Sequence, residues 1–357
     1  MNDNQGGSNN NADQTGGKSK RMAFSTDSVM TVSASPHIKG GETTSTIMAD
    51  VIIALLPALG WGVYIFGFRA LTLTAVSVAS CVLIEFLFCL IAKKRATVKD
   101  LSAVVTGMLI AFNLPVNTPL WAPIVGAAFA IIIVKQLFGG IGKNIVNPAI
   151  AARVFMALSF NFMAYFWDIS LEEKLPAFEI NLKVPLDAIA GATPLAELKQ
   201  GMTPEIGFFR MVLGEMGGCI GEISALCLLA GGIYLVWRKV ISWHIPMSFI
   251  ATVALVTLFL PKESSDTLNF ALGHVFSGGL FLGALFMATD YATSPITKSG
   301  KLIFGLGCGL ITVFIRYFGS YPEGVSFAIM IMNLFVWYID KATKPVRFGG
   351  ANVGKQQ

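Results

Sequence analysis

Residues 107–119 read GMLIAFNLPVNTP, an apolar run that is interrupted before it is long enough to cross a lipid bilayer. A helix needs about 20 apolar residues to cross. A helix that stops earlier leaves backbone amide and carbonyl groups without hydrogen-bond partners, which lipid cannot supply. The interrupted segment must therefore face other protein or a water-filled path.

A second segment of the same kind occupies residues 283–295 and reads GALFMATDYATSP. Further along the chain, VNPAIAA at 146–152 aligns with VSFAIMI at 325–331. The matches occur in the same order in both halves of the chain, which predicts an internal repeat. The aligned pairs are Gly107 with Gly283, Leu109 with Leu285, Pro119 with Pro295, Val146 with Val325, Ala149 with Ala328 and Ile150 with Ile329.

The composition predicts a membrane protein. Of the 357 residues, 54% are hydrophobic and 13% are charged, whereas a soluble domain has about 25% charged residues. The net charge of +5 is small and spread over the loops, which fits basic cytoplasmic loops better than a nucleic-acid-binding surface. We therefore expect an all-α integral membrane protein that binds no nucleic acid.

Runs of apolar residues predict about ten transmembrane helices. The third run is too short to cross alone, and the sixth is too long for one span and is interrupted by Glu215 and Glu222. The runs cover residues 46–67, 70–92, 101–115, 120–138, 147–167, 206–237, 241–260, 268–288, 301–318 and 324–340.

The basic residues predict the orientation of the chain, because cytoplasmic loops carry an excess of Lys and Arg. With ten spans, all the basic clusters lie on one side and both termini are cytoplasmic. Residues 168–206 then lie on the opposite side, with seven acidic and three basic residues. The clusters contain Lys18, Lys20, Arg21, Lys39, Lys93, Lys94, Arg95, Lys99, Arg238, Lys239, Lys298, Lys301, Lys341, Lys344 and Arg347.

An odd number of spans in each repeat gives the two repeats opposite orientations in the membrane. This predicts two inverted five-helix repeats with interrupted helices, over residues 41–167 and 207–341. Residues 168–206 form an extracytoplasmic loop between them. Residues 1–40 are expected to form a disordered, cytoplasmic N-terminal segment because they are polar and rich in Asn and Gly, and residues 342–357 form a cytoplasmic tail.

Two interrupted helices that meet at the midplane describe a binding site or a conduction path, or else two structural kinks. A charge at the bilayer centre costs about 2.5–3.5 kcal/mol on insertion scales. Glu85, within VLIEFLF, is paired, protonated or part of a cation route, and pairing is favoured. With Asp290 it is the candidate for an ion path. Asp50, Arg210, Asp290 and Arg316 lie near span ends, where side chains can reach water.

The stretch FGGIGKNIVNPAIAAR at 138–153 predicts a helix start with Asn147 as its cap and Pro148 at its first position. Lys143 and Arg153 add positive charge. Such a helix N-terminus suits an anion or a redox ring that becomes anionic. A re-entrant turn without a ligand is the alternative.

Cysteine and histidine positions predict no metal or iron–sulfur site. The cysteines lie in apolar segments without a C-x-x-C pair, and the histidines are scattered. These residues are Cys81, Cys89, Cys219, Cys227, Cys308, His37, His244 and His274.

The longest hydrophilic gap contains DAIAGATPLAEL at 187–198. Its residue types predict a helix start, with Thr193 as the cap, Pro194 at the first position and Glu197 nearby. The stretch also resembles the site at which a flavin transferase attaches FMN to a threonine through a phosphoester. That pattern runs Asp, two variable residues, usually Ser or Thr, then Gly-Ala-Thr.

Four residues match this pattern: Asp187, Gly191, Ala192 and the acceptor Thr193. Ala190 departs from it, because Ser or Thr is usual there. A helix cap and a flavin attachment site are compatible, since a helix start also favours a phosphate.

Three further stretches carry a resemblance to the RnfD/NqrB family over nearly the whole chain from about residue 30: SPHIKGGETTSTIMADVIIALLPAL at 35–59, GGIGKNIVNPA at 139–149 and FMATDYATSP at 286–295. The length is more similar to RnfD. The resemblance implies a flavin-bearing subunit of a prokaryotic inner-membrane complex that couples electron transfer between ferredoxin and NAD to export of Na⁺ or H⁺. It implies covalent FMN on Thr193 and leaves a second, noncovalent flavin such as riboflavin open.

The resemblance also implies partners. These are a flavin transferase and other Rnf-type subunits, including an extracytoplasmic covalent-flavin subunit and membrane and cytoplasmic electron-transfer subunits. No G-x-G-x-x-G follows a strand in this chain, so NAD electrons must enter through a partner, and the chain is an enzyme only as a subunit of a translocase. The alternative is a small-solute channel or secondary transporter without a redox role, because a fold does not fix a function.

Overall fold

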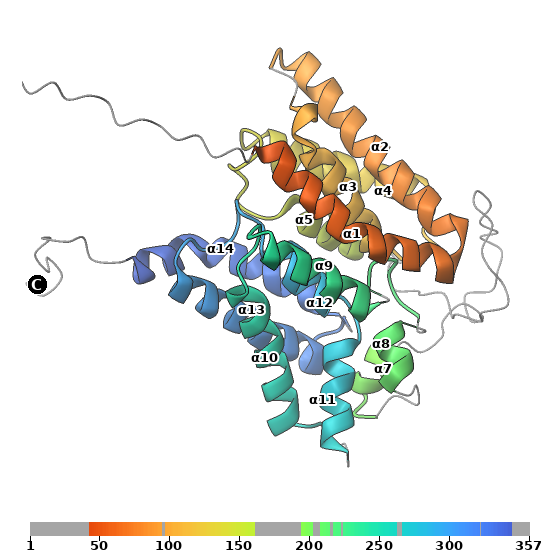
Figure 1. Ribbon diagram of the computed structural model, residues 1–357, viewed down its shortest axis with the longest axis vertical. Coiled ribbons are helices and arrows are strands. Elements are labelled where there is room, and N and C mark those ends of the chain that lie inside the picture. Colours follow the sequence, from red (N-terminus) through yellow and green to blue (C-terminus); the bar gives the residue numbers. More distant parts are fainter. Residues whose placement is uncertain are drawn as a thin grey trace, which may run out of the picture. The chain divides into compact units, whose positions relative to one another are not determined.

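The computed structural model describes residues 43–94, 97–160, 194–202, 208–214, 217–222, 224–262, 266–321 and 323–344 (Figure 1). These residues form helices joined by turns. Among these residues, extended backbone segments are paired at one isolated antiparallel bridge, between Pro115 and Cys219. The predicted all-α class is therefore confirmed.

Side chains cap the free backbone amides where helices of the first half begin. Thr43 and Thr46 form a capping box at the start of α1. Asn147 accepts hydrogen bonds from the amides of Ala149 (3.0 Å) and Ile150 (3.4 Å) at the start of α5, as the sequence predicted. The elements are α1 (Thr44–Phe66), α2 (Phe68–Ile91), η1 (Val98–Asp100), α3 (Ser102–Phe112), α4 (Trp121–Ala128), the π-helical η2 (Phe129–Gln136) and α5 (Pro148–Ser159).

Helices of the second half begin in the same way. Ser224, Asp266 and Thr297 each accept a backbone amide at the start of a helix. The elements are α7 (Pro194–Lys199), α8 (Phe208–Leu213), α9 (Ala225–Trp237), α10 (His244–Phe259), α11 (Thr267–Phe276), α12 (Leu280–Leu282), the π-helical η4 (Gly283–Met287), α13 (Lys298–Phe318) and α14 (Val325–Thr343).

The two halves repeat one pattern of neighbours. In the first half α2 packs against α3 and α4, and in the second half α10 packs against α11 and α13. The halves meet where α1 packs against α9 and where α5 packs against α14 (Figure 1). This pattern agrees with the predicted five-helix repeat. The opposite membrane orientation of the two halves and the loop and tail boundaries stay predictions.

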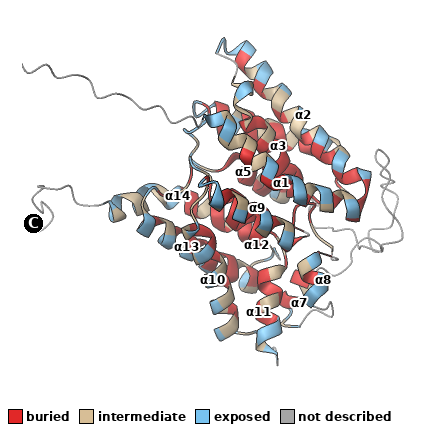
Figure 2. Ribbon diagram, in the orientation of Figure 1, coloured by how far each residue is buried: buried red, intermediate tan, exposed pale blue. Residues whose placement is uncertain are grey.

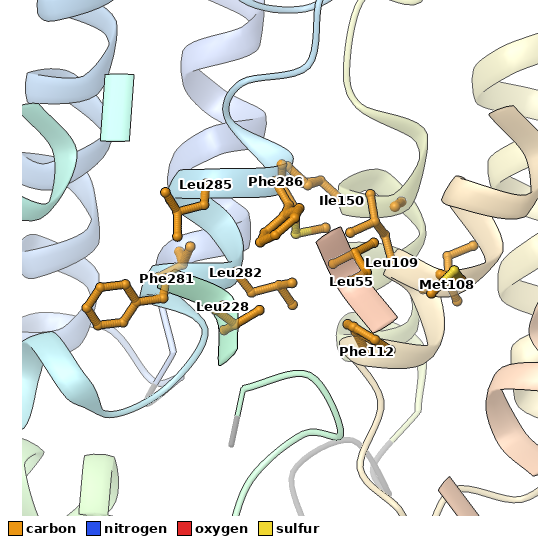
Figure 3. Packing of buried hydrophobic residues seen from close by; sticks show 14 of the residues in the cluster. Leu55, Met108, Leu109, Phe112, Ile150, Leu228, Phe281, Leu282, Leu285 and Phe286 are labelled. Carbon is orange, nitrogen blue, oxygen red and sulfur yellow. The ribbon is translucent and has the colours of Figure 1, made fainter. Parts of the chain in front are cut away.

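The apolar core continues from one half into the other. Leu55 of α1 and Leu109 and Phe112 of α3 are buried on one side of this core. Figure 3 shows Leu228 of α9 with Phe281 and Leu282 of α12 and Leu285 and Phe286 of η4 on the other side of the same core. The ends of the interrupted helices are thus held inside a packed core and away from lipid.

Large apolar side chains also cover the outer helix faces. On α2 the exposed residues include Leu83, Phe86 and Leu90, and on α13 they include Phe314 and Phe318. Figure 2 shows the exposed residues on the outer sides of these helices and the buried residues on the sides that face their neighbours. A chain in water rarely exposes so many contiguous apolar side chains, so these faces are suited to lipid.

Helix lengths agree with a multi-pass membrane protein. By length and composition α1, α2, α13 and α14 can each cross a membrane, and α11 with α12–η4, bent by 56°, forms a fifth candidate. Each of the other predicted runs contains a shorter apolar helix, namely α3, α4–η2, α5, α9 or α10. Because these are shorter than a usual span, the number of ten crossings stays a prediction.

The structure shows where two predicted interruptions lie. The interruption predicted within the apolar run 206–237 is confirmed, because Gly214 takes a positive φ of +85° after α8 and α9 begins only at Ala225. In the second repeat the aligned segment is interrupted after Met287, where η4 ends, and the helix is also bent earlier, at 277–279. Gly278 has a φ of +72°, which suits glycine, while Gly283 keeps a helical φ of −62°.

Candidate functional site between two helix breaks

The first break follows α3, and backbone from the second half supplies its missing hydrogen bonds. The Gly221 amide donates to the Phe112 carbonyl (2.9 Å), and the Ile220 amide donates to the Leu114 carbonyl (3.1 Å). These carbonyls are left free where α3 ends, and lipid could not bond them. The segment 219–221 therefore makes it possible to end a helix inside the membrane.

Arg153 of α5 supports the same break. Its guanidinium donates to the Asn113 carbonyl and forms an ion pair with Glu323 (2.5 Å). The Cys219 sulfur lies 3.3 Å from the same guanidinium. Arg153 therefore joins the end of α3 to the start of α14. From the sequence we expected Arg153, with Lys143, to add positive charge near the start of α5. This was wrong, because the Arg153 side chain lies at the first break.

Arg316 of α13 supports the second break. Its guanidinium is 1% exposed and donates to the carbonyls of His274 (2.5 Å) and Ser277 (3.2 Å) at the end of α11. A positive charge at a helix C-terminus is favourable because the last carbonyls carry partial negative charge. The prediction that Arg316 reaches water near a span end was wrong, because the side chain turns inward to the break.

Two carboxylates lie between the breaks. Glu222 precedes α9 and is 6% exposed, and Glu323 precedes α14 with a side chain that is 14% exposed. The Oε1 atoms of both are buried and have no hydrogen-bond partner among the described residues. Both lie beside Gly279, at the start of α12. The four charged side chains Arg153, Arg316, Glu222 and Glu323 are called the break cluster below.

Glu85 belongs to a separate network. It is fully buried, and the Lys135 ammonium bonds both its carboxylate oxygens at 2.9 and 2.8 Å. Gln136 donates to it at 3.1 Å and Thr97 donates as well. The favoured interpretation of Glu85 as one member of an ion pair is confirmed, and its role in an ion path stays a prediction.

Asp290 faces a cavity between the halves, of about 90 Å³. Its carboxylate accepts a hydrogen bond from Thr293 at 3.1 Å. Lys135, Asn147 and Pro148 line the same cavity, so the predicted helix start of α5 and the partner of Glu85 both face it. Asn147 also donates to the Met287 carbonyl at 3.2 Å, which joins α5 to the end of η4.

The residues of the flavin motif, Asp187, Gly191, Ala192 and Thr193, lie outside the described residues. The described chain resumes with α7 at Pro194. Leu195 and Leu198 of α7 are buried, and α7 packs against α11. The helix predicted to follow Thr193 is therefore present and rests on the interrupted span of the second half.

Comparison with known proteins identifies the family. The model of the NQR2, RnfD, RnfE family matches residues 31–349. The chain belongs to the NQR2, RnfD, RnfE family. It is 46% identical to a subunit of the "Na(+)-translocating ferredoxin:NAD(+) oxidoreductase complex" of Acetobacterium woodii, over 92% of this chain and 98% of that one. It is 38% identical to the corresponding subunit of the "Proton-translocating ferredoxin:NAD(+) oxidoreductase complex" of Clostridium ljungdahlii, over 90% and 96% of the two chains.

A third member of the NQR2, RnfD, RnfE family extends the comparison. The corresponding subunit of the "Ion-translocating oxidoreductase complex" of Stutzerimonas stutzeri is 38% identical, over 88% of this chain and 94% of that one. The three relatives thus align with this chain over nearly the full length of both sequences.

Sequence reasoning did not single out the break cluster. Glu323 stands between Pro322 and Gly324 and was placed in no candidate site. Glu222 was noted only as a charge that interrupts the apolar run 206–237, and Cys219 only as a cysteine in an apolar segment. The available signal was the pair Gly217-Gly218 followed by Gly221 within that run, because repeated glycines seldom continue a helix.

Proposed function

We propose that this chain is the RnfD-type membrane subunit of an Rnf complex, which couples electron transfer between ferredoxin and NAD to ion translocation across the cell membrane. The observation that carries the proposal is the near end-to-end match to relatives named as subunits of such complexes. One relative is named for Na⁺ and the other for protons, so the coupled ion is Na⁺ or H⁺.

The proposed cofactor is FMN, joined through a phosphoester to the hydroxyl of Thr193. The support is the motif from Asp187 through Gly191 and Ala192 to Thr193. The flavin supplies the electron chemistry, and the chain supplies the attachment point. An extracytoplasmic loop keeps the hydroxyl accessible to an exported flavin transferase. The cavity of about 90 Å³ is not needed for this covalent group.

Flavin fluorescence on a denaturing gel tests the attachment. We expect a fluorescent band at the mass of this chain in the wild type and none in Thr193→Val, which keeps the side-chain shape but lacks the hydroxyl. Thr193→Ser serves as the matched control, because it retains the hydroxyl and with it some attachment. A fluorescent band in the Val variant would assign the flavin to another residue. A dark wild-type band would favour a transporter without a redox role.

The proposed partners carry electrons to and from this chain. They are an extracytoplasmic covalent-flavin subunit near residue 193 and membrane and cytoplasmic electron-transfer subunits. We expect the purified chain alone to oxidise NADH at no more than the background rate, and the assembled complex to oxidise it with ferredoxin or an artificial acceptor. Substantial NADH oxidation by the isolated chain would contradict its role as one subunit of a complex.

The proposed ion path passes Asp290 and the Glu85–Lys135 pair, which meet the cavity between the halves. Asp290→Asn and Glu85→Gln should each lower ion transport more than electron transfer in the assembled complex. Asp290→Asn is the cleaner test, because Glu85→Gln also leaves Lys135 as an unpaired buried charge. Unchanged ion-to-electron ratios in both variants would remove these acids from the path and leave the flavin assignment intact.

A further inference from the structure

Two buried carboxylate oxygens converge on one point in the break cluster. A Cβ atom at Gly279 would lie 2.6 Å from Oε1 of Glu323 and 2.8 Å from Oε1 of Glu222. Neither oxygen accepts a hydrogen bond from the described residues. The absence of a side chain at Gly279 is what leaves this point open.

The neighbouring guanidinium groups balance the charge of the two carboxylates but form no hydrogen bond with these two oxygens. Arg153 bonds the other oxygen of Glu323, Oε2, and the Asn113 carbonyl. Arg316 directs its terminal nitrogens at the carbonyls of His274 and Ser277. The Cys219 thiol donates to the Asn113 carbonyl at 3.3 Å. These hydrogen bonds are thus directed away from the two Oε1 atoms.

Arg153 and Arg316 balance the two carboxylate charges overall, but two ionised oxygens that face one buried point still repel each other, because water is excluded there. A proton relieves the repulsion by forming an O–H···O hydrogen bond, and a sodium ion relieves it by binding both oxygens. The ends of α3 and α11 reach the break cluster through Arg153 and Arg316, and helix C-termini carry partial negative charge. Arg153 and Arg316 already bond these carbonyls, so it is the two facing Oε1 atoms that favour a further cation.

We propose that Glu222 and Glu323 hold one exchangeable monovalent cation, a proton or Na⁺, between their Oε1 atoms at Gly279. The site takes one ligand from the segment before α9 and one from the segment before α14, and it lies between the two helix breaks. It deepens the ion-translocating role proposed above and rests on it. The binding measurement that tests it needs no flavin and no electron transfer.

Two variants alter the proposed cation site while the fold should be retained. Glu222→Gln keeps the side-chain volume and removes one charge. Gly279→Ala keeps every charge and fills the point between the oxygens, with a φ of −76° that alanine adopts freely. Asp50→Asn is the matched control, because both oxygens of Asp50 are occupied by Tyr234 and Arg238. Circular dichroism verifies that each variant remains helical.

The experiment measures cation binding to the protein purified from membranes with its co-purifying subunits. NaCl is titrated against choline chloride at constant ionic strength, and the thermal unfolding midpoint is followed by tryptophan fluorescence. If the cation is Na⁺, sodium raises the wild-type midpoint. The apparent Kd should then rise at least about tenfold in Glu222→Gln and in Gly279→Ala, as expected for the loss of a charged buried contact, and should not change in Asp50→Asn.

If the cation is a proton, the wild-type midpoint shows no sodium-specific rise. Infrared difference spectra between acidic and alkaline buffer should then contain a protonated-carboxyl band that is lost in Glu222→Gln and shifted in Gly279→Ala. A sodium response and an infrared spectrum that are both the same in the wild type and in these two variants would overturn the proposal. If the wild-type band showed no flavin fluorescence in the gel experiment while the cation response was intact, only the proposed redox role would be overturned.

Discussion

A guanidinium group can bond several carbonyl oxygens at once, and Arg316 uses this at the end of α11. Its partners lie about forty positions earlier in the chain, at 274 and 277, so no local sequence pattern indicates them. The same holds for Arg153, whose partners come from three separate segments. Local rules did suffice for Asn147, because a cap and its helix are neighbours in sequence.

Replacing Arg316 should destabilise the protein strongly. Arg316→Met leaves two buried carbonyls without their donor, and we expect a loss of about 2–6 kcal/mol in unfolding free energy, since each unsatisfied buried polar group costs about 1–3 kcal/mol. Arg316→Lys should lose less, because its ammonium keeps the positive charge although it cannot reach both carbonyls in the same way. Chemical or thermal unfolding of the purified protein measures this loss.

Arg238→Met is the control, since Arg238 pairs with Asp50 while its side chain is 46% exposed. A partly exposed pair contributes about 0–1 kcal/mol. Equal losses of unfolding free energy in the Arg316 and Arg238 variants would show that burial of Arg316 does not increase its contribution to stability.

A single glycine conformation sets the bend between α11 and α12. Gly278→Ala forces a side chain into a φ of +72° and brings its Cβ to 2.8 Å from Leu195 of α7. We expect a loss of about 1–3 kcal/mol from backbone strain, plus a crowding cost. The thermal unfolding midpoint measures the combined effect.

Gly60→Ala is the matched helical control, because a Cβ there meets nothing within 4 Å in the part of the chain that the structure describes. It should be neutral or stabilising by up to about 1 kcal/mol. If Gly278→Ala were as stable as Gly60→Ala, the left-handed conformation at the bend would be of no consequence for the fold.

The two helix breaks differ in how well the sequence predicted them. Asn-Leu-Pro after α3 correctly placed the first break, because proline and asparagine stop a helix locally. The alignment also indicated the end of η4 at Met287, but it did not indicate the bend at Gly278, because both glycines that it matched, Gly107 and Gly283, are helical. An apolar sequence alone does not distinguish a helical glycine from a left-handed one.

At the scale of the whole molecule, the two termini and the loop 168–206 should lie on opposite sides of the membrane. A cysteine introduced into this loop on a background without the five native cysteines should react with an impermeant maleimide from outside intact cells. A cysteine introduced after α14, for example at Lys344, should react only after lysis, and it serves as the control. Labelling of the loop solely from the cytoplasmic side would contradict both the ten-span topology and the extracytoplasmic flavin.

The backbone bonds that Ile220 and Gly221 donate to the end of α3 have a consequence for hydrogen–deuterium exchange. These two amides belong to no helix, yet they are buried and can exchange only when the segment before α9 separates from α3. Their exchange rate therefore reports how often the two halves separate at this contact. If the halves part during turnover, deuterium should enter at these two positions faster in working enzyme than in resting enzyme, while amides in the middle of α2 keep the same rate in both.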